Sequence, residues 1–442
     1  MTELRQAEVV VIGAGIAGLA CATELLENGR DVVVVEAASR AGGPVDTARH
    51  GEIVVERGPQ TVRATPALTL AFERAGLRPV QAARRPPYVL TNGELIRMPP
   101  GLRDLARGRP LSPWALLAGV LGEPFRRHPP GPRTVRRMVE ERFGERIAAV
   151  LSDALTLGVY SQPSDRIGFE SAYPELADDL DRHGSLLLTG LARRFRRGPK
   201  EPRGATITAA GGLATLMDRL ADRLGERLHL DTPAIAVERS GGSFRIETGG
   251  TPSQLEGRHV VLAVPPPQAA RMLAGSRAAP LLAQTAMAPQ TLAIFASKDA
   301  AAVERWQSLG FLVPAREKLP LIGCLFPSAL FPDRAPLDVL LMTVFIGPAL
   351  RDATDATIAH EVGRILSRLL RTSRPPDLLE ACRHPVGIPI YDRRHRDRTR
   401  AARRHLADEQ GPLLAGAGYD GVGFGAAATS GIRAAEEIFL RS

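Results

Sequence analysis

Three glycines in the segment Gly13-Ala14-Gly15-Ile16-Ala17-Gly18 follow the spacing GxGxxG. The first glycine permits a tight turn, the second lets the backbone approach a pyrophosphate, and the third allows a helix to pack closely on a strand. Glu36 follows about 20 residues later, where a carboxylate accepts hydrogen bonds from ribose hydroxyls. These residues, with Ala37 beside the acid, predict a dinucleotide site.

The elements around these residues fit that prediction. A continuous apolar, β-branched run over residues 8–12 predicts a buried parallel strand. A helix is expected over residues 17–28, with Gly29 as its C-cap, and a second strand over residues 31–36. The result is a βαβ unit whose helix N-terminus presents free N–H groups to the phosphates.

A second motif, Arg40-Ala41-Gly42-Gly43, points to flavin-adenine dinucleotide (FAD) as the cofactor. The acid at Glu36 disfavours the 2′-phosphate of NADP. The glycine doublet lets a second loop pass close to the same pyrophosphate, and Arg40 adds positive charge. An ordinary turn is the alternative explanation of Gly42-Gly43.

Further segments are assigned to the same cofactor. Near the C-terminus, glycines follow a short strand and precede a helix expected from about Ser430, so their N–H groups would again face the flavin. The additional cofactor residues are Gly58, Pro59, Val237, Gly416, Gly421, Val422 and Gly423.

Composition narrows the class of protein. The chain of 442 residues suits two or three interleaved units, and its hydrophobic content of 44% is that of a globular protein. The net charge of +9 comes almost entirely from arginine, which indicates either attraction to an anionic partner or a GC-rich genome. No motif for nucleic-acid binding accompanies this charge.

The cysteines and the hydropathy pattern favour a cytoplasmic protein. Cys21, Cys324 and Cys382 lie far apart, which argues for a reducing compartment and against disulfides or a metal site. We find no secretory signal and no apolar run long enough to span a membrane. The sequence leaves a homodimer and a peripheral membrane contact open.

We expect an α/β fold with a Rossmann-like FAD-binding domain assembled from discontinuous segments. We also expect a substrate domain with a mixed sheet and a Pro- and Arg-rich helical insertion. The insertion should contain one long helix over residues 134–158. The expected divisions are residues 1–62, 206–264 and 408–442 for the FAD-binding domain, 63–85 and 265–407 for the substrate domain, and 86–205 for the insertion.

From about Val9 to Ile438, the order and spacing of motifs resemble the protoporphyrinogen oxidase branch of the FAD-dependent amine oxidase superfamily. The segments that carry the resemblance are Glu56 to Pro59, Tyr88-Val89-Leu90 before Gly93-Glu94-Leu95, Gly158-Val159-Tyr160, Tyr173-Pro174, Gly184-Ser185-Leu186, Gly310 to Pro314, Phe331-Pro332, Gly387 to Tyr391 and Leu414 to Gly423.

The resemblance implies a reaction. This family removes six electrons from a porphyrinogen, hydride leaves a meso carbon for flavin N5, and oxygen reoxidises FAD to give H2O2. Protoporphyrinogen IX is the leading substrate and coproporphyrinogen III the alternative. Because the cofactor carries the chemistry, no catalytic side chain and no metal are assigned. An amine oxidase or desaturase, and a non-catalytic flavin or porphyrin carrier, are the other classes considered.

The resemblance also implies substrate contacts. Arg63 would pair with a substrate carboxylate, with a surface arginine as the alternative. Gly158 would let a main-chain carbonyl approach the macrocycle, or it caps a helix. Met272 and Leu312 would form walls of the tetrapyrrole site, or they belong to the core.

Three departures from the family pattern stand out. Pro44 replaces a basic residue, Ile390 replaces a glutamine, and the run Ala426 to Ala428 occupies positions that are usually polar near the flavin. The insertion corresponds to a subdomain that relatives use to meet the membrane, although a channel or core helix is the alternative. The residues expected to dip into the bilayer are Leu111, Trp114, Leu116, Leu117, Val120 and Leu121, beside Arg126 and Arg127.

Overall fold

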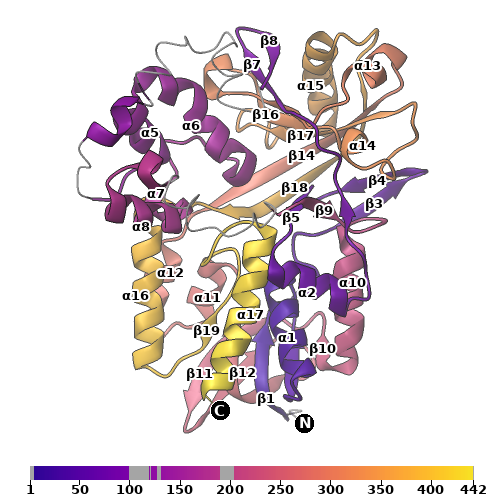
Figure 1. Cartoon of the computed structure of the whole chain (residues 1–442). Coiled ribbons are helices and arrows are strands. Elements are labelled where there is room, and N and C mark those ends of the chain that lie inside the picture. Colours follow the sequence, from indigo (N-terminus) through magenta and orange to yellow (C-terminus); the bar gives the residue numbers. More distant parts are fainter. Residues whose placement is uncertain (1–3, 99–118, 120, 127–130, 190–203, 442) are drawn as a thin grey trace.

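The computed structural model describes residues 4–98, 119, 121–126, 131–189 and 204–441. Two halves lie end to end in Figure 1, each built on its own sheet. Both chain termini lie at the far end of the first half, and a helical segment flanks the second half. The predicted α/β fold is confirmed.

The first sheet follows the order β10-β2-β1-β13-β12-β11, with β19 beside β13. Strands β10, β2, β1, β13 and β19 are parallel, and β11 and β12 add an antiparallel meander. The strands are β1 (Leu4–Ile12), β2 (Val32–Val35), β10 (Leu228–His229), β11 (Ala234–Ser240), β12 (Ser243–Thr248), β13 (Gln254–Leu262) and β19 (Leu413–Leu414).

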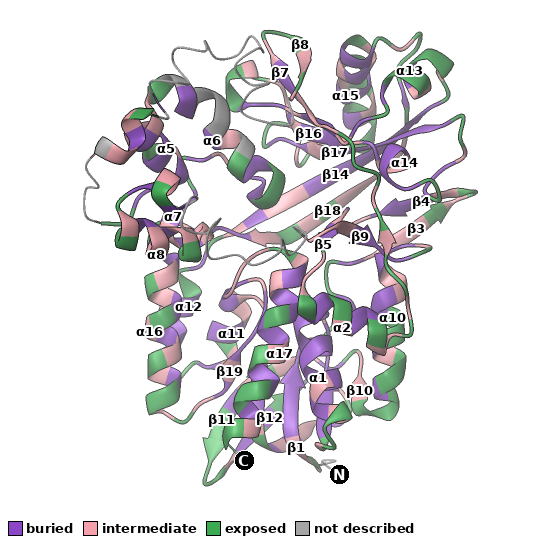
Figure 2. Cartoon of the chain, viewed as in Figure 1, coloured by how far each residue is buried: buried purple, intermediate pink, exposed green. Residues whose placement is uncertain are grey.

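Alternating side chains of the first sheet serve two cores. Val9 and Val11 face the helices of one side, whereas Val10 and Ile12 face the other side. All four are almost fully buried, as the purple strands of Figure 2 show. The helices around this sheet are α1 (Ile16–Glu27), α2 (Pro66–Arg74), α10 (Leu213–Leu224), α11 (Pro266–Met272), α12 (Ala279–Ala283), α16 (His395–Asp408) and α17 (Phe424–Arg441).

The second sheet follows the order β18-β14-β17-β16-β15-β7-β8 and mixes parallel and antiparallel pairs. Its strands are β7 (Tyr88–Thr91), β8 (Glu94–Arg97), β14 (Met287–Ser297), β15 (Gly310–Leu312), β16 (Leu321–Leu325), β17 (Leu340–Ile346) and β18 (Asp377–Pro389). Helices α13 (Ala300–Arg305), α14 (Pro327–Leu330) and α15 (Asp355–Leu370) accompany it.

Two features of this sheet differ from the sequence prediction. Residues 88–97, which were assigned to the helical insertion, form the edge strands β7 and β8 because β7 pairs with β15. Strand β18 was not predicted, since it is mostly half-buried and carries polar residues such as Glu380 and His384 without regular alternation. It is nevertheless paired with β14 over most of its length.

The helical segment contains α5 (Val135–Phe143), α6 (Glu145–Tyr160), α7 (Phe169–Ala172) and α8 (Pro174–His183). The single helix expected over residues 134–158 is wrong, because Gly144 at φ +91° breaks it in two. Helix α6 continues to Tyr160 and ends with Ser161 in the left-handed region, so Gly158 is not a cap.

Only two of the residues expected to meet the membrane lie in the described part of the chain. Leu111, Trp114, Leu116, Leu117, Val120 and Arg127 lie outside them. Leu121 is exposed, and Arg126 is half-buried with one N–H donated to the Glu141 carbonyl at 3.3 Å. In the described part of the chain, no helix has the length and apolar composition that crossing a bilayer requires.

Two small sheets connect the halves. One pairs β3 (Thr47–His50) with β4 (Ile53–Glu56), and the other has the order β5-β9-β6. The strands of the latter are β5 (Val62–Arg63), β6 (Val80–Gln81) and β9 (Thr206–Thr208).

A buried ion pair lies where these small sheets meet the second sheet. Arg334 Nη2 is 3.0 Å from Glu56 Oε1, and both side chains are at least 95% buried. Glu56 also accepts hydrogen bonds from the Thr47 hydroxyl at 2.7 Å and from the Leu213 amide at 2.9 Å. Arg334 donates to the Thr208 hydroxyl at 2.6 Å. Burial raises the pKa of Glu56, and the Arg334 charge opposes that rise.

We expect Arg334→Met to lower the free energy of unfolding by roughly 3–5 kcal/mol, because Glu56 would be left buried without its partner. Urea unfolding followed by circular dichroism measures this. The matched control is Arg137→Met, which removes an exposed guanidinium paired with Glu141 and should cost about 1 kcal/mol or less. Equal losses in the two variants would contradict the assigned role of the buried pair.

Candidate functional site

The glycine turn after β1 forms an open cradle. Gly13 has φ +104°, and a Cβ on it would lie 2.7 Å from the Ala263 carbonyl oxygen. A Cβ on Gly18 would lie 1.8 Å from the Gly13 oxygen, so the helix packs as closely as expected. A Cβ on Gly15 would meet no atom within 4 Å, and α1 begins at Ile16 without a side-chain cap. Free space in front of uncapped N–H groups fits a pyrophosphate.

Glu36 lies beside this cradle, directly after β2. Its carboxylate accepts hydrogen bonds from the Ala14 amide at 2.7 Å and the Ala38 amide at 2.9 Å. The backbone after β10 supports this acid, and no sequence motif predicted it. The Thr232 amide donates to the Glu36 carbonyl at 2.8 Å, and the Asp231 amide donates to the Ala38 carbonyl at 3.0 Å. Their position just after β10, which pairs with β2, was the available signal.

Two residues assigned to this part of the site differ in position. Ala37 is exposed next to Glu36. Val237 is not brought to the acid, because β11 lies at the opposite edge of the sheet from β10 and β2. Its side chain is buried in the second core with Phe244 and Ile246.

The glycine doublet contacts the first glycine loop. The Gly42 amide donates to the Ala14 carbonyl at 2.8 Å. A Cβ on Gly43 would lie 3.5 Å from the Gly15 Cα, so the two loops face each other. Both doublet residues have positive φ, which favours glycine there.

Arg40 stabilises this second loop from within. Its guanidinium donates to the carbonyl of Val45 at 2.6 Å and to that of Gly43 at 3.1 Å. The positively charged guanidinium of Arg40 therefore lies next to the cradle, and two of its N–H groups already donate to carbonyls of the loop.

The segment after β4 packs against the same loop. A Cβ on Gly58 would lie 1.8 Å from the Pro44 oxygen, so only glycine allows this approach. Pro59 is half-buried. The buried Gln60 holds the turn through its amide nitrogen, which donates to the carbonyls of Glu56 at 2.7 Å and Gly58 at 3.0 Å.

The C-terminal loop over residues 416–423 lies next to the glycine cradle. Gly416 has φ +117°, and a Cβ on it would lie 3.6 Å from the Ala17 Cβ, which brings this loop to the start of α1. The Gly416 amide donates to the Ser430 hydroxyl at 2.8 Å, and Ser430 donates to Asp420 at 2.5 Å. Arg403 binds the same carboxylate through two hydrogen bonds of 2.7 and 2.8 Å. Burial disfavours the charged carboxylate, but these partners lower the pKa of Asp420 to about 2.

The rest of this loop and the alanine run can now be located. Gly421 and Val422 are half-buried and Gly423 is exposed. Helix α17 begins at Phe424 rather than near Ser430, so residues 426–428 form its first turn.

The small residues of this turn have a packing reason. Ala427 and Ala428 are buried in the core shared with α1. A Cβ on Gly425 would lie 2.9 Å from the Arg63 oxygen, and one on Gly431 would lie 2.0 Å from the Ala17 oxygen. Close packing of α17 therefore favours small side chains where the family usually has polar ones.

The residues expected to contact substrate do not all lie together. Gly158 is exposed on α6, and α6 contacts β15, which carries the half-buried Leu312. Arg63 is exposed on β5 with its carbonyl next to Gly425. Met272 ends α11 and packs against the second core of the first sheet.

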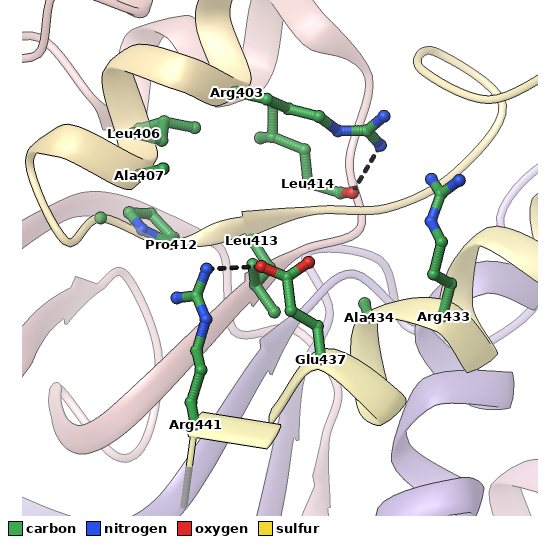
Figure 3. A pocket seen from close by; sticks show the side chains of 11 residues that line it. Arg403, Leu406, Ala407, Pro412, Leu413, Leu414, Arg433, Ala434, Glu437 and Arg441 are labelled. Atoms are coloured by element: carbon green, nitrogen blue, oxygen red, sulfur yellow. Dashed lines mark hydrogen bonds and ion pairs between the residues drawn. The ribbon is translucent and has the colours of Figure 1, made fainter. Parts of the chain in front are cut away.

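A separate pocket of about 150 Å³ opens between α16, β19 and α17. Figure 3 shows Arg441 paired with Glu437, and Arg403 donating to the Leu414 carbonyl. None of the predicted cofactor or substrate residues lines this pocket. In the part of the chain that the structure describes, no His, Cys, Asp or Glu cluster could hold a metal.

His395 lies behind the C-terminal loop and is 2% exposed. Its ring stacks on Tyr391, with centroids 3.9 Å apart and planes 20° from parallel. Burial, followed by the nearby Arg398 charge, lowers the pKa of His395 to about 4. These contacts indicate a packing role for a neutral imidazole.

Comparison with known proteins agrees with this geometry. Residues 16–439 match the model of the flavin-containing amine oxidoreductases. The chain belongs to this family. It is an FAD-dependent oxidoreductase, and the prediction of FAD as cofactor is confirmed.

The similarity to individual relatives extends over the whole length. The chain is 27% identical to the chloroplastic protoporphyrinogen oxidase of Nicotiana tabacum, over 98% of this chain and 85% of that protein. It is 29% identical to the protoporphyrinogen oxidase of Homo sapiens, over 97% and 98%. A solved candidate protoporphyrinogen oxidase from Exiguobacterium sp. 255-15 superposes with a TM-score of 0.83 at 25% identity, covering 99% of both chains. A putrescine oxidase at 18% identity and a TM-score of 0.68 shares the fold, with 99% of this chain and 100% of that chain covered.

We expect Glu36→Ala to raise the dissociation constant for FAD by about tenfold or more, because a carboxylate that binds the amides of Ala14 and Ala38, and that would accept hydrogen bonds from the ribose hydroxyls, is lost. Flavin fluorescence released on dilution measures this. Glu238→Ala, at an exposed position on β11, is the control and should retain FAD like the unaltered protein. Equal retention by both variants would remove Glu36 from the site.

His395 should make the fold sensitive to acid. Its neutral form is favoured in the folded state, so the unfolded chain takes up a proton first as pH falls below about 6.5. Stability from this group is complete above pH 6.5, and about 3 kcal/mol is lost by pH 4. His395→Phe should flatten the difference between unfolding free energies at pH 7 and 4, whereas a change at the exposed His360 should not. Parallel profiles for His395→Phe and the unaltered protein would refute the assignment.

Proposed function

We propose that this protein oxidises protoporphyrinogen IX to protoporphyrin IX, with FAD as hydride acceptor and O2 as the final acceptor, giving H2O2. The observation that carries the proposal is similarity over nearly the whole chain to protoporphyrinogen oxidases of plants and mammals. When bound, FAD supplies the site that accepts hydride and passes electrons to oxygen. The protein must hold the substrate next to that site and keep competing reactions out.

Arg63 is the residue best suited to orient the substrate. Its guanidinium is exposed, and among the described residues it has no hydrogen-bonded or ionic partner. Its backbone lies beside Gly425, at the start of the helix that follows the flavin-facing loop. A planar guanidinium binds a carboxylate through two parallel hydrogen bonds, so Arg63 suits a propionate of the tetrapyrrole.

The remaining contacts are proposed on α6 and β15. The exposed Gly158 leaves room for a flat macrocycle, because a Cβ there would meet no protein atom within 4 Å. Leu312 on the adjacent strand offers an apolar wall. These elements come from the helical segment and the second sheet, whereas the cofactor loops come from the first half.

The test is a comparison of protoporphyrinogen IX and coproporphyrinogen III with FAD-loaded enzyme in air. We expect porphyrin fluorescence to appear faster with protoporphyrinogen and well above its autoxidation rate. Faster oxidation of the coproporphyrinogen would assign the tetracarboxylate as substrate instead. No rate above autoxidation with either compound would end the proposal.

Arg63→Ala should raise KM for the porphyrinogen by about tenfold or more while FAD stays bound, because a charged hydrogen-bond partner of the substrate is removed. Initial rates at varied substrate concentration measure KM, and the flavin absorbance reports cofactor content. Arg227→Ala, which changes an exposed arginine in the short 3-10 turn before β10, serves as control. An unchanged KM in Arg63→Ala would exclude this residue from substrate binding.

We also infer a cytoplasmic enzyme that meets the membrane surface through its helical segment. The support is the exposed Leu121, five residues before the half-buried Arg126, since an exposed apolar side chain in an arginine-rich segment suits an anionic bilayer face. Sedimentation with anionic vesicles tests this contact, and light scattering tests the homodimer.

A further inference from the structure

The phenol of Tyr391 lies beneath the flavin-facing loop and is 2% exposed. Its hydroxyl donates to the Ala417 carbonyl at 2.8 Å and accepts a hydrogen bond from the Gly421 amide at 2.8 Å. The phenol hydroxyl of Tyr391 therefore makes one hydrogen bond as donor and one as acceptor, both to the same loop. Removing it would leave a half-buried N–H and a half-buried carbonyl without this partner.

The same residue is held from the other side by the helical segment. The Gly168 amide donates to the Tyr391 carbonyl at 2.7 Å. The rings of Tyr391 and Tyr160 are 5.8 Å apart, and both belong to the core of the helical segment. The Ser171 hydroxyl donates to the Asp392 carbonyl at 2.7 Å, which ties down the next residue of the chain.

The loop thus has two anchors of different origin. Gly416 and Asp420 are held by Ser430 on α17 and Arg403 on α16, within the first half of the molecule. The contacts through Tyr391 instead connect the loop to the helical segment and to the end of β18. Gly421 and Ala417, which Tyr391 contacts, flank Asp420 on either side.

We propose that Tyr391 is a positioning residue that sets the path of residues 417–421 beside the flavin and ties that path to the helical segment. The inference rests on the flavin position of the proposed function, and it does not depend on which substrate is oxidised. Backbone N–H groups near a flavin favour its more negative, reduced form, so a shift of this loop changes the flavin potential.

Tyr391→Phe tests this, because it keeps the ring and its stacking on His395 and removes only the hydroxyl. We expect a flavin midpoint potential more negative than that of the unaltered protein and a shifted flavin absorbance band. We also expect a dissociation constant for FAD that is about three- to tenfold higher, as the loss of one hydrogen-bonded group produces. All are measured on the FAD-loaded protein without substrate.

Two further variants separate the contributions. Tyr160→Phe removes a hydroxyl from the same core that bonds to the Ala172 carbonyl within the helical segment, and it should leave the flavin potential unchanged. Ser171→Ala weakens the hold on residue 392 without touching the loop, and it should move the potential in the same direction by a smaller amount.

An unchanged potential and FAD affinity in Tyr391→Phe would overturn the inference, as would an equal shift in Tyr160→Phe. If Tyr391→Phe does not fold, Ser171→Ala decides, and the absence of any shift refutes the link to the helical segment. A yellow protein that oxidises no porphyrinogen would refute the proposed function alone. If Glu36→Ala lost FAD while Tyr391→Phe kept it with unchanged affinity and potential, the cofactor site would be supported and the role of Tyr391 refuted.

Discussion

The carboxylate of Glu56 is held in the interior by a guanidinium, a hydroxyl and a backbone amide from three other parts of the chain. Arg334 belongs to the second half, and Leu213 begins a helix of the first half. An unpaired buried charge costs several kcal/mol of folding free energy. Arrangements of these segments that separate Glu56 from Arg334 are therefore strongly disfavoured. The turn from Glu56 to Gln60 passes directly from this ion pair to the loop of the glycine doublet, where Gly58 packs against the Pro44 carbonyl. The ion pair therefore fixes how the two halves meet beside this loop.

The cofactor loops depend on a second constraint, which is close backbone packing. Gly18 against Gly13, Gly58 against Pro44 and Gly431 against Ala17 all meet where a Cβ would overlap a carbonyl oxygen. These contacts bring distant segments within reach of one cradle. The same constraint gives the alanine run at the start of α17 a structural reason, since this turn packs into the core shared with α1.

Local patterns were sufficient for the elements that carry the cofactor. The β-branched run before Gly13, the glycine turn and Glu36 each indicate their own backbone conformation. The helix and the second strand begin and end within one residue of the expected bounds, whereas the first strand ends at Ile12 as expected but begins at Leu4 instead of residue 8. The prediction of secondary structure failed where contacts with residues distant in the sequence, or a local backbone conformation, determine the element. Strand β18 exists because β14 offers it a partner, and the helix expected through Gly144 is broken by a backbone conformation that helical periodicity does not reveal.

The sequence by itself determined the cofactor and the fold class, because a phosphate cradle needs glycines at fixed spacing and an acid at a fixed distance along one βαβ unit. Only the tertiary structure decided which residues complete the site. Asp231 and Thr232 support Glu36, and Tyr391 closes the C-terminal loop, yet none of these contacts is visible in a short stretch of sequence. Val237 and Met272 pack in or against the second core for the same reason, since the order of strands and the packing of helices, rather than spacing along the chain, determine which side chains meet.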